Sequence, residues 1–84
     1  MVYGGSMRFG DWVYAQLEKH ERSVNWLAKK VGCSHSAFLD YKKTDREVST
    51  RVLMETIKVL AEEAGKSEER VLLYVARHCY GVGE

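Results

Sequence analysis

The sequence contains no proline and only two cysteines, and it has neither a long apolar run nor a large net charge. Two cysteines cannot supply a disulfide framework, which excludes the small secreted proteins that depend on one. No stretch approaches the roughly 20 apolar residues that a membrane-spanning helix needs. The formal net charge is +1, so the overall balance does not point to a polyanionic partner.

The first residues, MVYGGSMR, lack a basic head followed by an apolar stretch, so they do not form a secretory signal. Together with the sparse cysteines, this indicates a reduced, cytoplasmic protein. A length of 84 residues supports one domain. We predict that residues 1–6 are a flexible leader, that residues 7–80 form the domain and that residues 81–84 are a tail.

The sequence also lacks the residue spacings that are typical of a catalytic or metal-binding site. Cys33 and His35 are two residues apart, but a nucleophile and its base need a third group that orients the base. Cys33 is moreover expected to point into the core. His78 and Cys79 are adjacent and diverge on a helix, and two cysteines give no structural zinc spacing. We therefore predict no enzyme, no catalytic residue, no metal and no cofactor.

What the sequence does contain is a series of serines, each followed by a stretch with helical apolar spacing. Serine is a favoured N-cap because its hydroxyl accepts a hydrogen bond from a free amide in the first turn. These serines are Ser6, Ser23, Ser34, Ser49 and Ser67. No segment alternates with the period of a strand. The sequence predicts a compact all-α domain of five helices, over residues 7–21, 24–31, 35–42, 50–64 and 68–79.

The second and third of these segments carry an ordered set of small and apolar residues. Ala28, next to Leu27, is small enough to let one helix approach the other closely. Gly32 stands at the turn, where a positive φ costs glycine little. Phe38 and Tyr41 are spaced to pack the third helix onto the second. This pattern resembles the helix-turn-helix of the lambda-repressor-like family.

The resemblance covers roughly residues 7–66. In that family the third helix enters the major groove and points its first residues at base edges. The resemblance therefore implies two sets of contacts to double-stranded DNA, one to bases and one to phosphates. The implied base-facing residues are His35, Ser36, Leu39 and Asp40. The implied phosphate contacts are Asn25, Ser34, Lys42, Lys43, Arg46 and Arg51.

Two features depart from the family's pattern, one at Val24 and one at the pair Leu39 and Asp40. The family often has Gln at the first residue of the second helix, where this chain has Val24, with Asn25 next to it. Leu39 can touch only a thymine methyl or another apolar surface, and Asp40 repels phosphates unless it accepts from a cytosine amine. These departures leave an alternative open, in which a degenerate helix-turn-helix scaffold serves as a protein-interaction module.

The small net charge hides a basic part and an acidic part of the chain. Residues 22–51 carry seven basic and three acidic side chains, a net charge of +4. Residues 52–70 carry three basic and five acidic side chains, a net charge of −2. A polarity of this kind suits a protein that docks one face on a phosphate backbone. The plainer interpretation is that both charged regions are solvent-exposed faces that bind no partner.

Trp12 and Trp26 occupy positions that are usually polar in the family. Two explanations stay open for them. In the first, both rings are buried and pack together where the first two helices meet. In the second, they form an exposed aromatic patch that binds another protein.

The last segment, residues 68–79, is apolar almost all round. A small domain covers one face of such a helix, and the other face then requires a second surface. We predict that this surface is a second copy of the chain, related by a two-fold axis. The predicted homodimer contacts are Val71, Leu72, Val75 and Cys79. The alternative is a helix that caps the core of one chain and leaves Tyr74 and Tyr80 half exposed.

The sequence as a whole predicts a sequence-specific DNA-binding transcription regulator of the nucleoid, a repressor of phage or plasmid type. Residues 35–42 would occupy the operator, and a homodimer would read two half-sites about one helical turn apart. The protein-interaction module remains the rival hypothesis. A DNA affinity that falls steeply as the salt concentration rises would support the regulator over its rival, because phosphate contacts release counterions.

Overall fold

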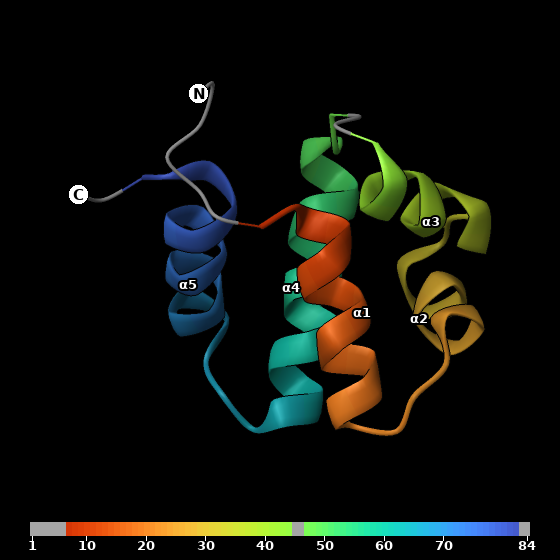
Figure 1. The fold of residues 1–84 in the computed structure, drawn as a ribbon. Coiled ribbons are helices and arrows are strands. Elements are labelled where there is room, and N and C mark those ends of the chain that lie inside the picture. The colour runs from red at the N-terminus through yellow and green to blue at the C-terminus, as the bar shows by residue number, and fades with distance from the viewer. Residues whose placement is uncertain (1–6, 45–46, 83–84) are drawn as a thin grey trace.

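A computed structural model describes residues 7–44 and 47–82, and these residues form helices and no strand (Figure 1). In chain order the helices are α1 (Phe9–Lys19), α2 (Val24–Val31), α3 (His35–Lys43), α4 (Thr50–Ala64) and α5 (Glu68–Tyr80). α5 lies on one side of α1 and α4, and the pair α2 and α3 lies on the other. The prediction of an all-α domain with five helices is confirmed.

Serine hydroxyls begin three of these helices, as predicted. Ser23, Ser49 and Ser67 each accept a hydrogen bond from the backbone amide three residues further on, at 3.1, 3.3 and 3.2 Å. Ser34 stands at the N-cap position of α3, but its side chain makes no capping bond. Ser6 lies outside the described residues. Three of the five helix starts are therefore fixed by a local hydrogen bond that the sequence reveals.

Glycine ends α2 and α4. Gly32 has φ +83° and Gly65 has φ +68°, both in the left-handed region that a side chain disfavours. The predicted left-handed turn at Gly32 is confirmed.

α1 is shorter than predicted at both ends, because it begins at Phe9 and ends at Lys19. Glu21 has φ +56°, so the chain has already left the helix there.

One cluster of buried apolar side chains holds the helices together. Each helix contributes at least one side chain that is at most 1% exposed: Val13 from α1, Leu27 from α2, Phe38 from α3, Ile57 from α4 and Val75 from α5. Burial of this kind stabilises a fold by roughly 1.5–3 kcal/mol for each large apolar side chain.

No helix within the described part of the chain has the length and apolar character needed to cross a bilayer.

Thr56, in α4, is a polar side chain within this core. It is 0% exposed, and its hydroxyl has no hydrogen-bond partner among the described residues. A buried hydroxyl without a partner is less stable than an apolar group of the same shape. Thr56→Val should therefore raise the free energy of unfolding by about 1 kcal/mol, measured by urea denaturation. Thr56→Ser keeps the hydroxyl and loses a methyl, so it should lower the stability. A destabilised valine variant would mean that the hydroxyl has a partner.

The two tryptophans do not pack together. Trp12 is 4% exposed and contacts the ring of Phe9 at a centroid distance of 5.8 Å. Trp26 is half-buried between the guanidinium of Arg22, 4.8 Å from its ring centroid, and the ammonium of Lys30, 5.9 Å away. Among the described residues no ring contact joins them. The first explanation is therefore right about the burial of Trp12 and wrong about the pairing of the two rings. The second explanation is excluded for Trp12 because this ring is buried.

Candidate nucleic-acid interface

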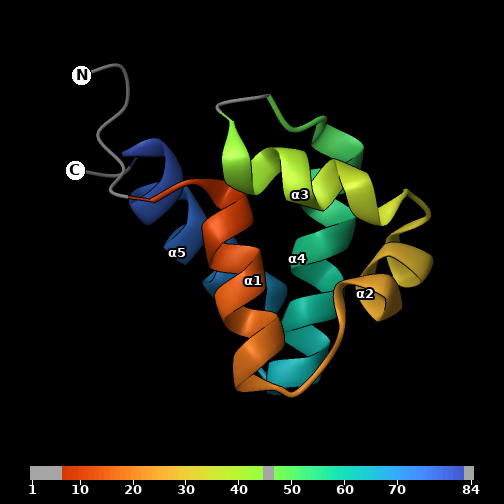
Figure 2. The same ribbon diagram turned by 45° about the vertical axis from the view of Figure 1, so that its right-hand side comes forward.

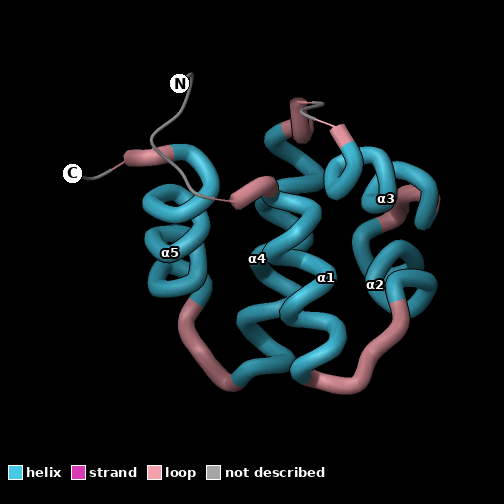
Figure 3. Tube along the Cα trace, viewed as in Figure 1, coloured by secondary structure: helices cyan, strands magenta, loops and turns pink. Residues whose placement is uncertain are grey.

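α2 and α3 are joined by a turn of residues 32–34 (Figure 3). The inner face of α3 carries Phe38, which is 0% exposed, and Tyr41, which is 6% exposed. Their rings meet edge to face at a centroid distance of 5.9 Å. Tyr41 also meets the ring of Phe9 in α1 at 6.4 Å. Aromatic packing therefore fixes which side of α3 faces the core.

The opposite side of α3 faces outward and carries the four residues predicted to face bases. His35, Ser36, Leu39 and Asp40 are all exposed. Positions separated by one, four and five residues lie on the same side of a helix. Lys43 extends this side by another turn and is also exposed. α3 runs along the outside of the molecule, as the rotated view shows (Figure 2). The structure thus brings the predicted residues together on one accessible surface.

The end of α3 is held by the start of α1. Gly10 lies so close to the backbone of Tyr41 and Lys42 that a Cβ on it would collide with backbone atoms. One guanidinium nitrogen of Arg8, Nη1, donates hydrogen bonds to the carbonyl oxygens of Lys42 and Lys43, both at 3.2 Å. These contacts set the position of α3 relative to the rest of the domain. The available sequence signal was a glycine inside a helical pattern, which often marks close packing.

Two of the predicted phosphate contacts are engaged within the fold. Arg51 donates a hydrogen bond from Nη1 to the carbonyl oxygen of Val31, at 3.0 Å. It thereby joins the end of α2 to the start of α4. The ammonium of Lys42 lies over the ring of Tyr14 in α1, 4.7 Å from its centroid. Both side chains turn toward neighbouring helices, which the sequence does not reveal.

The remaining predicted phosphate contacts are Asn25, Ser34, Lys43 and Arg46. The first three are exposed, and Ser34 and Lys43 lie at opposite ends of α3. Arg46 lies outside the described residues. Arg22 also contributes less positive charge to this surface, because its Nε lies 2.8 Å from a carboxylate oxygen of Glu63.

The predicted dimer surface on α5 is wrong for three of its four residues. Val71, Val75 and Cys79 are 8%, 1% and 4% exposed, because they face the chain's own core. Leu72 is half-buried against the same core. The side of α5 that does face outward carries Leu73, with 56% of its surface exposed, and a homodimer would need that other side. The homodimer itself stays a prediction.

Neither cysteine is an activated nucleophile. Burial raises the pKa of the Cys79 thiol to about 11, and the negative charge of Asp11 adds to this. Burial also raises the pKa of the Cys33 thiol, with the positive charge of Arg51 acting in the opposite direction. Both thiols are therefore protonated at neutral pH. Within residues 7–44 and 47–82, no group of three or more His, Cys, Asp or Glu side chains is placed to hold a metal ion.

Comparison of the chain with known protein families, with curated proteins and with solved structures gives no match. The resemblance to the lambda-repressor-like family stays a prediction that rests on α2 and α3.

Proposed function

We propose that this protein binds double-stranded DNA in a sequence-specific manner and regulates transcription by occupying an operator. The observation that carries the proposal is the outward side of α3. Its inner side is fixed by the buried rings of Phe38 and Tyr41, so the helix presents a rigid, exposed surface. The major groove of B-DNA admits one α-helix, which reads base edges with its outward side chains.

The side chains on this surface match the chemistry of base edges. His35 and Ser36, in the first turn, exchange hydrogen bonds with bases. Leu39 suits the methyl group of thymine, and Asp40 suits the amine of cytosine. A helix oriented in this way would therefore favour particular base pairs at the positions of Leu39 and Asp40.

Phosphate contacts are available at both ends of α3. At its start, the hydroxyl of Ser34 makes no capping bond, and the free amides of the first turn attract phosphate oxygens. At its end, Lys43 supplies a positive charge. Contacts on either side of the base-reading residues would fix the register of the helix in the groove.

Salt titration of DNA binding tests the proposal. A preferred sequence is first selected from random duplexes, and its affinity is then measured at several salt concentrations. Lys43→Ala should weaken binding to all sequences and reduce the slope of log affinity against log salt by about one. Lys58→Ala, which changes an exposed lysine on α4, is the matched control and should leave the slope unchanged.

An absence of salt-dependent affinity for any duplex would contradict the proposal and favour the protein-interaction hypothesis. That alternative retains Leu39 and Asp40 as exposed residues. It loses most of the predicted aromatic surface, because Trp12 is buried and Trp26 is covered by two cationic side chains.

A further inference from the structure

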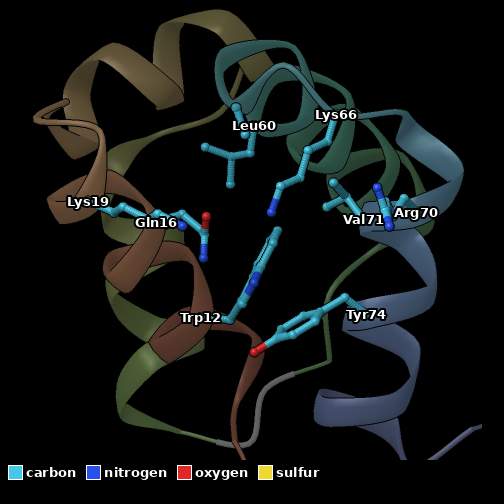
Figure 4. A pocket seen from close by; sticks show the side chains of 9 residues that line it. Trp12, Gln16, Lys19, Leu60, Lys66, Arg70, Val71 and Tyr74 are labelled. Atoms are coloured by element: carbon cyan, nitrogen blue, oxygen red, sulfur yellow. The ribbon is translucent and has the colours of Figure 1, made fainter.

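A cavity of about 480 Å³ lies between α1, the end of α4 and the first turns of α5 (Figure 4). No residue that lines it belongs to α2 or α3. The cavity is thus separate from the surface proposed to bind DNA. Its volume falls in the range of about 300–1,000 Å³ that is typical of sites for small molecules.

The wall of the cavity that faces the core is aromatic and aliphatic. Trp12, Leu60 and Val71 line it and are at most 8% exposed, so their positions are fixed by packing. Tyr74 lines the cavity from α5, and its ring lies against that of His78 at a centroid distance of 4.2 Å and an interplanar angle of 33°. Figure 4 shows the rings of Trp12 and Tyr74 on the same side of the cavity. The ring of Tyr74 is 46% exposed, whereas Trp12 is 4% exposed, so it is the ring of Tyr74 that offers a planar, apolar guest a surface.

Three basic side chains also line the cavity, and no acidic side chain does. They are Lys19 from α1, Lys66 from the connection before α5, and Arg70 from α5. Lys66 extends into the cavity, with its ammonium toward the ring of Trp12 (Figure 4). Among the described residues none of these three cationic groups has an ion-pair partner. A cavity lined by basic side chains and no acidic one favours an anionic guest.

We propose that this cavity binds a small aromatic anion, a planar ring system that carries one carboxylate. The ring would lie against the exposed ring of Tyr74, next to the buried ring of Trp12, and the carboxylate would be held by Lys66 and Arg70. Arginine and lysine form charge-assisted hydrogen bonds with carboxylates, and arginine can do so through two nitrogens. No residue of α2 or α3 lines this cavity, so a ligand can bind there without DNA.

Three probes separate the contributions of ring and charge. 1-Naphthoate carries both, 1-naphthalenemethanol carries the ring without the charge, and acetate carries the charge without the ring. In NMR titrations 1-naphthoate should give saturable binding below roughly 1 mM and shift the indole N–H signal of Trp12. The indole signal of Trp26, in α2, should stay in place. Each of the other two probes should bind at least about tenfold more weakly.

Substitutions then locate the site. Lys66→Gln and Arg70→Gln should each weaken 1-naphthoate binding by about tenfold. Lys58→Gln, which removes an exposed charge on α4 outside the cavity, is the matched control and should leave the affinity unchanged. All three positions are exposed, and circular dichroism verifies that each variant is folded. Equal losses in the three variants, equal binding of the uncharged probe, or no saturable shift of Trp12 would each overturn the proposal.

Discussion

Replacing Gly10 with alanine should lower the free energy of unfolding by at least about 2 kcal/mol. Gly10 is buried within α1, where an added Cβ would collide with the backbone of Tyr41 and Lys42 in α3. Backbone atoms of a helix cannot rotate away as the end of a flexible side chain can, so the two helices must separate. For a domain of 84 residues, a loss of this size lowers the melting temperature by roughly 10 °C.

The sign of this effect is diagnostic, because helix propensity alone predicts the opposite. Alanine in a helix interior is more stable than glycine by about 1 kcal/mol. Ala15, exposed on the same helix, provides the matched control, and Ala15→Gly should destabilise by about 1 kcal/mol. Thermal unfolding followed by circular dichroism measures both variants. A Gly10→Ala variant that melts at or above the wild-type temperature would show that α1 and α3 are not in close contact.

Helix positions were predictable because their signals are local. A serine that caps its own helix and a glycine that ends it act within a few residues of the chain. Four of the five predicted helices accordingly match the observed ones to within one residue at each end. α1 is the exception, since its N-cap position is occupied by Arg8 rather than by a serine and its end precedes the positive φ of Glu21.

Contacts between helices were less predictable, because an apolar period shows which residues are buried but not against what. α5 illustrates this point. One of its apolar stripes contains Val71, Val75 and Cys79, and another side contains Leu73 and Tyr80. The sequence does not distinguish the two, and the structure turns the first toward the core. Val71, Val75 and Cys79 were therefore predicted to contact a second copy, although they face the chain's own core.

For the candidate site as well, one part could be predicted from the sequence and another part could not. The exposed side of α3 follows from helical period once Phe38 and Tyr41 are assigned to the core, so the placement of the predicted base-facing residues needed no tertiary information. The positions of the cationic groups did need it. Lys42 and Arg51 have long side chains that contact Tyr14 and the Val31 carbonyl, both distant in sequence.

Simultaneous replacement of His35 and Ser36 with alanine should remove sequence-specific DNA binding and leave the fold intact. Each lost base contact is expected to cost about 1–3 kcal/mol, so the double variant should lose roughly 2–6 kcal/mol of affinity for the selected sequence. Both side chains are exposed, and alanine is the best helix former, so helical content should be unchanged.

Binding to unrelated sequences distinguishes the loss of base contacts from a general defect. Because phosphate contacts are independent of sequence, the double variant should bind unselected DNA as well as the wild type does. Its affinities for selected and unselected duplexes should therefore converge, which fluorescence anisotropy with labelled duplexes measures. A matched double variant on α4, Lys58→Ala with Glu62→Ala, changes two exposed residues away from α3 and should retain the preference. If the His35 and Ser36 variant still prefers the selected sequence by the wild-type margin, α3 is not the recognition helix, since its first turn contributes nothing to the discrimination between sequences.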